Sequence, residues 1–290
     1  MKAVVLFFTT VFIAQFCFAH EDEWKPVSAG PATTWTAPIC TEGKFTAQPF
    51  FFYNRTRGTF DSSGHYSALP DGDKKSQYQQ QLFIQYGVTD KFEADGQAVY
   101  QENFRRQNGN NAHSEGFGDS FIFLRYCAIE EKEWLPQVTG LFQLKFPTGK
   151  YQGLDPAELG TDSMGPASGG GSYDHGYGVI LTKKIRPFLL HADALYSFPI
   201  AAKVDGVRTK YGNYTNYDFA AEYFLTNGFN LEAEFNGFIQ NDKKQEYLIF
   251  SPGIGWSCDK VQTLLAYQRV LTGKNTDAND SVVFAFVYIF

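Results

Sequence analysis

The sequence lacks the long apolar runs from which helical membrane proteins are built. Hydrophobic residues make up 43% and aromatic residues 17% of the 290 residues, yet the mean hydropathy is −0.29. The apolar residues are therefore dispersed among polar ones, which excludes a bundle of transmembrane helices with about 20 consecutive apolar residues each. The high aromatic content also argues against a disordered chain, since such chains are poor in aromatic residues.

The sequence also has few cysteines, fewer basic than acidic residues and no helical periodicity. The four cysteines, Cys17, Cys40, Cys127 and Cys258, include no CxxC pair, so neither a disulfide framework nor a zinc site built on cysteine is expected. The formal net charge of −6 gives no reason to expect a nucleic-acid partner. Apolar residues do not recur over any length at the spacing of an amphipathic helix.

Residues 1–19 are predicted to be a Sec-type signal peptide that is removed before folding. Lys2 provides the positive charge, a short apolar stretch follows, and Ala19 is a small residue suited to cleavage. An N-terminal anchor helix is the alternative, but the apolar stretch is short for a membrane span.

The rest of the chain alternates apolar and polar residues with the period of a β-strand whose two faces differ. From Phe229 to Phe235 the odd-numbered positions are apolar and the even-numbered positions are Asn or Glu. The stretches 92–100 and 188–198 show the same pattern. In all, we predict twelve strands, at 44–57, 75–87, 91–103, 116–129, 134–147, 172–184, 187–198, 211–225, 228–240, 245–257, 260–270 and 280–290.

The connections between these strands differ in length in a regular way. From the second strand onward, every other connection has only two to four residues, whereas most of the intervening ones are longer and polar or glycine-rich. Short turns at one end and long loops at the other are typical of an outer-membrane β-barrel, and a soluble β-sandwich gives no reason for them. In lipid only helices and closed barrels pair every backbone polar group. We therefore predict an all-β fold, a transmembrane antiparallel up-and-down β-barrel of about 12 strands in residues 44–290.

The C-terminal stretch from Ser281 to Phe290 places aromatic residues on one face up to the last residue of the chain. It resembles the signal by which the bacterial barrel-assembly machinery recognises its substrates. The sequence therefore predicts export to the bacterial outer membrane, with the membrane lipid and this machinery as partners. The residues of the predicted assembly signal are Phe284, Phe286, Tyr288 and Phe290.

Several stretches in order along the chain resemble the bacterial outer-membrane family named after the meta-pathway of phenol degradation. They are GFGDSFIFLRY at 116–126, FPTGKYQG at 146–153, LGTDSMGPASGGGSYDHGYG at 159–178 and HADALYSFP at 191–199. The family usually has Leu before Pro-Thr-Gly, where this chain has Phe146. The resemblance covers residues 45–290 and implies a barrel that passes small hydrophobic or aromatic compounds.

Polar residues on the inward face of the predicted strands would line the lumen. Twelve strands leave a narrow passage, and ionisable groups inside a membrane protein pair with one another or line a pathway. Two arrangements stay open, a narrow pore with a charged lining and a lumen closed by ion pairs of Arg125 and Lys145 with acidic neighbours. The acidic excess argues against a preference for anions. The candidate lumen residues are Glu93, Asp95, Asp119, Arg125, Lys145, His191, Asp193, Asp218, Glu222, Glu232 and Glu234.

No catalytic site, metal site or cofactor is predicted. His191 and Asp193 share one face of a strand, but nothing supplies a matching nucleophile. Outer-membrane phospholipases also have twelve strands and carry a lipid-facing set of Ser, His and Asn. In this chain, Ser172 and His175 have no clear Asn partner.

The predicted function is an outer-membrane channel for the passive passage of small organic solutes, including aromatic or hydrophobic ones. A non-conducting surface protein for adhesion or envelope structure is the alternative. Specificity would come from the lumen residues and from the loop at 148–171. Residues 20–43 are predicted to form a periplasmic N-terminal tail, which either tucks into the barrel mouth or, the interpretation that we favour, is a loosely ordered lead-in.

Overall fold

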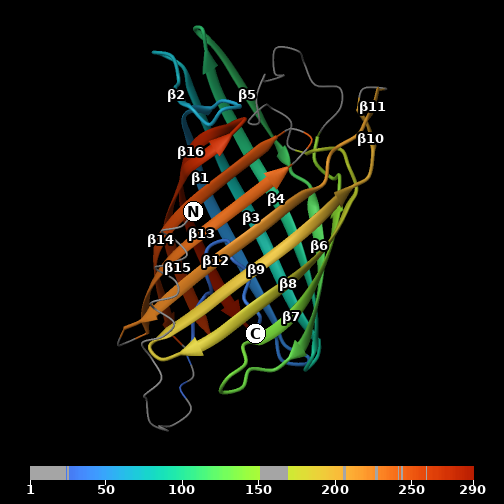
Figure 1. Cartoon of the computed structure of the whole chain (residues 1–290), viewed down its shortest axis with the longest axis vertical. Coiled ribbons are helices and arrows are strands. Elements are labelled where there is room, and N and C mark those ends of the chain that lie inside the picture. Colours follow the sequence, from blue (N-terminus) through green and yellow to red (C-terminus); the bar gives the residue numbers. More distant parts are fainter. Residues whose placement is uncertain are drawn as a thin grey trace.

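Most of the chain folds into a closed antiparallel β-barrel (Figure 1). The computed structural model describes residues 24, 26–150, 169–204, 207–225, 228–240, 242, 244–258 and 260–290. The predicted signal peptide and residues 151–168 of the predicted loop lie outside these ranges. Among the described residues, no helix is long and apolar enough to cross a membrane.

Twelve long strands form the wall of the barrel, each paired with its neighbours in chain order. β16 pairs with β1 and closes the barrel, with Val282 opposite Tyr53. The predicted up-and-down barrel of twelve strands is therefore confirmed. The strands are β1 (Phe45–Phe60), β3 (Lys74–Thr89), β4 (Phe92–Gln107), β6 (Ser120–Ile129), β7 (Gln137–Phe146), β8 (Asp174–Ile185), β9 (Phe188–Pro199), β12 (Tyr214–Phe224), β13 (Phe229–Gln240), β14 (Gln245–Cys258), β15 (Val261–Lys274) and β16 (Thr276–Ile289).

Short additional strands extend the barrel at the end that carries the long connections (Figure 1). β2 (Tyr66–Ala68) pairs with the end of β1, and β5 (Asn110–Phe117) forms a hairpin with β4. β10 (Ala202–Val204) and β11 (Val207–Thr209) form a separate hairpin. In the described part of the chain, three of the long connections thus contain strands.

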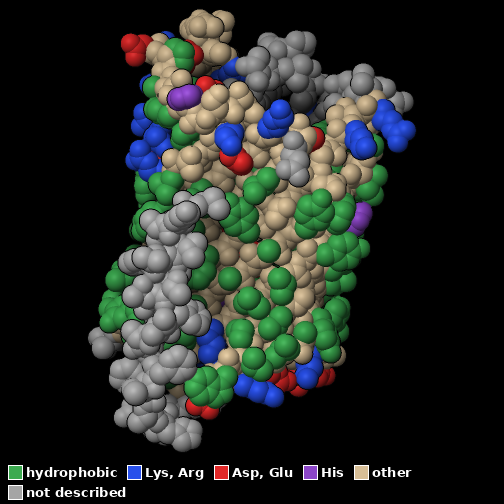
Figure 2. Space-filling model, viewed as in Figure 1, with side chains coloured by type: hydrophobic (Ala, Val, Ile, Leu, Met, Phe, Trp, Pro, Cys, Tyr) green, Lys and Arg blue, Asp and Glu red, His purple; other side chains and the backbone are tan. Residues whose placement is uncertain are grey.

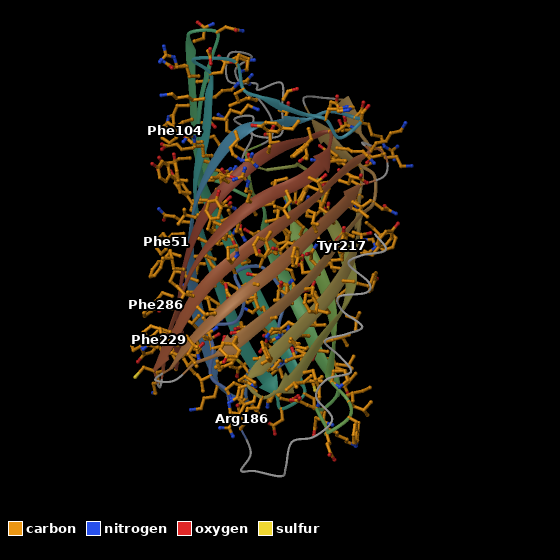
Figure 3. All side chains as sticks on the ribbon, turned by 60° about the vertical axis from the view of Figure 1, so that its left-hand side comes forward. Phe51, Phe104, Arg186, Tyr217, Phe229 and Phe286 are labelled. Carbon is orange, nitrogen blue, oxygen red and sulfur yellow. The ribbon has the colours of Figure 1, made fainter. Side chains whose placement is uncertain are left out.

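On the side seen in Figure 2, the outer face of the wall carries hydrophobic side chains over its middle and charged ones toward both ends. Leu82 and Leu231 are exposed on this face, as lipid contact requires. Phe284 on β16 and Phe290, directly after β16, point outward and are 41% and 46% exposed, whereas the intervening Ala285 and Val287 are buried. The predicted assembly-signal residues thus share the outer face, with Phe286 and Tyr288 partly exposed (Phe286 is labelled in Figure 3).

Candidate functional site

The N-terminal segment runs through the half of the lumen nearer the short turns. Ala37 is fully buried in an apolar cluster with side chains of β3, β6, β7, β8 and β9. Ala32 lies in a second cluster, with residues of β15 and β16. We call residues 28–40 the plug segment. For these residues the favoured interpretation, a loosely ordered lead-in, is wrong, because wall side chains hydrogen-bond backbone groups from Ala32 to Cys40 and pack against the segment.

Glu234 on β13 holds the middle of the plug segment. Its carboxylate accepts hydrogen bonds from the backbone N–H groups of Ala32, Thr33 and Thr34, at 2.6, 3.1 and 2.9 Å. The Thr34 hydroxyl donates a fourth bond at 2.9 Å. The Glu234 side chain is fully buried, so these charge-assisted bonds are shielded from water.

Arg125 on β6 joins the wall to the plug segment from the opposite side. Its guanidinium lies 2.5 Å from a carboxylate oxygen of Glu93 and 3.9 Å from one of Asp95. It also donates to the backbone carbonyl oxygen of Thr36 and, at 2.9 Å, to that of Pro38. Arg125 is 1% exposed, so one buried cation binds the Glu93 carboxylate of the wall and the carbonyl groups of the plug segment together.

Three further hydrogen bonds fix the end of the plug segment. Asp193 accepts from the Trp35 N–H at 2.8 Å, and the Thr182 hydroxyl accepts from the Ala37 N–H at 2.8 Å. The Thr139 hydroxyl donates to the Ala37 carbonyl at 2.6 Å. The segment has no secondary structure of its own, and these side chains replace the partners that a strand neighbour would supply.

The Trp35 ring is the apolar anchor of the plug segment. It packs edge-on against Phe123 and Phe83, with centroid distances of 4.8 and 5.5 Å. Arg125 lies over the same ring at 5.5 Å, within the range of a cation–π contact. The inner face of β6 is therefore apolar as well as charged.

His191 on β9 belongs to a buried polar cluster near the short turns. Its Nε2 lies 3.0 Å from Glu222, and its Nδ1 lies 2.9 Å from the Thr182 hydroxyl. Glu222 also accepts from Asn230 at 2.7 Å. His191 thus pairs with Glu222 across strands and not with Asp193 along its own strand, which leaves the considered His–Asp arrangement unformed.

Lys145 on β7 holds a separate cluster toward the long connections. Its ammonium lies 2.8 Å from Asp174 and 3.6 Å from Asp119. Tyr214 donates to Asp174 at 3.1 Å. The structure thus brings together the predicted residues Lys145 and Asp119, with Asp174 as a partner that the sequence did not indicate.

Two more carboxylates lie beside these clusters. Asp218 faces Asp193 across the β9–β12 pair, and Glu232 faces Glu222 across the β12–β13 pair. Glu232 is 5% exposed, and neither of its oxygens has a hydrogen-bond partner among the described residues. The inner face of the wall carries all the predicted lumen residues, which are Glu93, Asp95, Asp119, Arg125, Lys145, His191, Asp193, Asp218, Glu222, Glu232 and Glu234.

A cavity of about 770 Å³ lies between the plug segment and the wall. Uncharged amide side chains contribute much of its lining, and several hydrogen-bond one another: Gln97 donates to Gln81 at 2.7 Å, and Asn54 to Gln77 at 2.7 Å. Aromatic rings, residues of the plug segment and the charged side chains of Arg125, Asp193, Asp218, Arg269 and Asp277 provide most of the rest. The amides are Gln48, Asn54, Gln77, Gln79, Gln81, Gln85, Gln97, Gln143, Asn216, Asn236, Gln245, Gln268 and Asn279, and the rings are Trp35, Phe50, Phe52, Phe83, Phe121, Phe123, Tyr214 and Tyr247.

This amide lining was not among the predicted lumen residues, which were all ionisable. The signal was present on β3, where Gln77, Gln79, Gln81 and Gln85 recur with the period of one strand face. A strand with uncharged polar residues on one face and apolar residues on the other predicts a lumen-facing surface as well as a strand with charged residues does.

Comparison with known proteins relates this barrel to outer-membrane proteins. A family model described as "Putative MetA-pathway of phenol degradation" matches residues 91–286. The crystal structure of an outer membrane channel from Pseudomonas putida F1 has a TM-score of 0.71 at 14% identity, over 91% of this chain and 100% of that chain. The translocator domain of the autotransporter NalP from Neisseria meningitidis has a TM-score of 0.51 at 12% identity, over 87% of this chain and 89% of that chain. No curated protein matches the sequence. At these identities the likeness shows the fold, a transmembrane β-barrel.

Proposed function

Since the chain belongs to the family described as "Putative MetA-pathway of phenol degradation", we propose that it is an outer-membrane channel for the passive passage of small organic solutes. The observation that carries this proposal is the cavity of about 770 Å³ inside the barrel, bounded by the wall and the plug segment. Its volume falls within the usual range of about 300–1,000 Å³ for small-molecule sites.

The lining of the cavity supports a preference for uncharged solutes with an aromatic or other apolar face. Amide groups donate and accept hydrogen bonds without carrying charge, so they suit hydroxyl and carbonyl groups. Phe50, Phe52 and Tyr247 offer ring surfaces for stacking. The two buried cations that were predicted to lie in the lumen, Arg125 and Lys145, are paired with carboxylates, which leaves little attraction for anions.

Passage through the barrel requires the plug segment to move. The plug segment is held by hydrogen bonds and side-chain packing, so its displacement breaks no covalent bond. A seated plug and a displaced plug are then two states of one channel.

The proposed setting is the bacterial outer membrane, with the short turns facing the periplasm. The N-terminal tail would enter the lumen from that side after removal of residues 1–19. The C-terminal residues Phe284, Phe286, Tyr288 and Phe290 would be recognised by the barrel-assembly machinery, and lipid would cover the apolar outer face.

Single-channel recording in planar bilayers tests the proposal with two proteins, residues 20–290 and a variant that lacks residues 20–40. We expect the variant to conduct in discrete steps and the full mature chain to conduct rarely. A neutral aromatic alcohol should block the current of the variant more strongly than a benzoate-like anion of the same size. A folded variant that does not conduct would refute the channel.

The plug segment also favours a second candidate, the non-conducting surface protein for adhesion or envelope structure. In that case the plug is a permanent part of the barrel interior. The full mature chain would stay silent under every voltage and solute, although its plug-deleted variant conducts.

A further inference from the structure

The β4–β5 hairpin lies at the end of the barrel with the long connections (Figure 1) and carries three side chains of types that bind metal ions. Glu102 lies on β4, and His113 and Glu115 lie on β5. One ligand atom from each of these residues lies within 4.8 Å of the other two. We propose that the three side chains form a binding site for a divalent transition metal of the zinc class.

The turn of the hairpin sets the register that brings the three residues together. Asn108 and Gly109 both have positive φ, 51° and 81°, as a two-residue Asn-Gly hairpin turn requires. This turn places Glu102 directly opposite Glu115 and Phe104 opposite His113. Residues two apart on a strand share a face, so all three ligands project to the same side.

The opposed carboxylates are a reason for the hairpin to bind a cation. Like charges directly opposite each other in an antiparallel pair destabilise the pairing. In the described part of the chain, neither Glu102 nor Glu115 forms an ion pair with lysine or arginine. A divalent cation between them would replace this repulsion with attraction.

Neighbouring rings restrain two of the ligands. The His113 ring packs on Phe104 with centroids 4.7 Å apart, and Phe104 packs edge-on against Tyr78 at 6.0 Å (Phe104 is labelled in Figure 3). The Tyr100 hydroxyl lies close to the Glu115 carboxylate. Contacts of this kind orient metal ligands and raise metal affinity.

The donor set favours zinc-like ions over magnesium or calcium, because an imidazole nitrogen suits Zn²⁺, Cu²⁺ and Ni²⁺ whereas the hard cations prefer oxygen alone. Ligand atoms around tetrahedral Zn²⁺ lie about 3.3 Å apart. His113 and Glu115 are exposed and Glu102 is partly exposed, so rotation of these side chains closes the remaining distance. Water would complete the coordination at this surface site.

Titration of the folded mature chain with ZnCl₂, followed by calorimetry, tests the site. We expect one equivalent to bind and each of His113→Asn, Glu102→Gln and Glu115→Gln to weaken affinity by at least about tenfold. His65→Asn is the matched control, because His65 is exposed beside a single carboxylate, Asp61, at 3.7 Å. Co²⁺ should give a ligand-field spectrum that His113→Asn abolishes.

The proposal would be overturned if a variant with all three substitutions bound Zn²⁺ as tightly as the wild-type chain. It would also be overturned if His65→Asn weakened Zn²⁺ binding as much as the substitutions at the site. A measurement without any variant guards against misfolding of the substituted chains. Zn²⁺ should slow amide hydrogen exchange in residues 99–117 of the wild-type barrel, whereas Mg²⁺ should not. Unchanged exchange with saturating Zn²⁺ would overturn the proposal too.

Discussion

Replacing Glu234 with glutamine weakens the attachment of the plug segment at one defined point. In the wild-type barrel one oxygen accepts from the Ala32 N–H, and the other accepts from the Thr33 N–H and from both donors of Thr34. A glutamine offers one oxygen and one NH₂ group. At least one backbone N–H of the plug segment therefore faces another donor in place of an acceptor.

The size of the effect follows from the bonds that are lost. A hydrogen bond to a charged group contributes about 1.5–3 kcal/mol net. Each 1.4 kcal/mol changes an equilibrium about tenfold, so losing one such bond favours the displaced plug by a factor of about 10 to 150. If the plug is seated most of the time in the wild-type channel, the open probability should rise by the same order.

Single-channel recording of Glu234→Gln beside Glu232→Gln measures this effect. Glu232 lies two residues away on the same face of β13, is 5% exposed, and has no hydrogen-bond partner among the described residues. Glu232→Gln therefore removes a buried carboxylate without releasing the plug segment and should leave the open probability near the wild-type value. The open events of Glu234→Gln should have the conductance of the variant that lacks residues 20–40.

Two outcomes would refute this reasoning. If Glu234→Gln opens no more often than Glu232→Gln while the deletion variant conducts, the four hydrogen bonds do not hold the plug segment. If the deletion variant itself fails to conduct, the plug segment is not what closes the lumen.

Three further predictions concern the plug contacts and the C-terminus. Arg125→Ala leaves Glu93 buried without its cation and should lower the free energy of unfolding in urea by about 3–5 kcal/mol. A loss below about 1 kcal/mol would contradict the view that Arg125 and Glu93 form a buried ion pair. Burial and the nearby Glu93 carboxylate raise the pKa of the Cys40 thiol to about 12. Its thiolate fraction at pH 8 is then about a thousandfold below that of an ordinary thiol, so mass spectrometry should find Cys258, which is exposed, labelled long before Cys40. Deleting Phe290 should slow barrel assembly in cells, measured as the heat-modifiable fraction, with no loss of stability once folded.

The strands were predictable from the sequence wherever the two faces of the wall differ. On β13 the lipid face is apolar and the inner face is charged, and the predicted bounds of 228–240 agree closely with the observed ones. On β6 and β15 the alternation is poor, because Phe123 and Leu264 point inward to pack near Trp35 and Ala32. The inner residues are apolar where the plug segment covers the wall. A search for alternating apolar and polar residues does not detect a strand that is apolar on both faces.

The inward direction of the charged residues could be predicted, but their partners could not. Alternation along β13 assigns Glu234 to the lumen, since its neighbours of opposite character face the lipid. The donors that it accepts from lie some 200 positions earlier in the chain. No spacing rule links such distant residues, and the plug segment lacks the periodicity by which a strand or helix is recognised.

The contacts of the plug segment give a structural reason for acidic residues on the inner face of the wall. An irregular segment inside a barrel has backbone N–H groups that need acceptors, and a buried carboxylate needs donors. Glu234 and Asp193 meet both needs at once, because each accepts from plug N–H groups. On this reasoning these two acidic residues of the inner wall serve to seat the plug segment. We therefore expect substitutions of Glu234 and Asp193 to change how often the channel opens, and substitutions of the cavity amides, such as Gln81, to change which solutes pass once it is open.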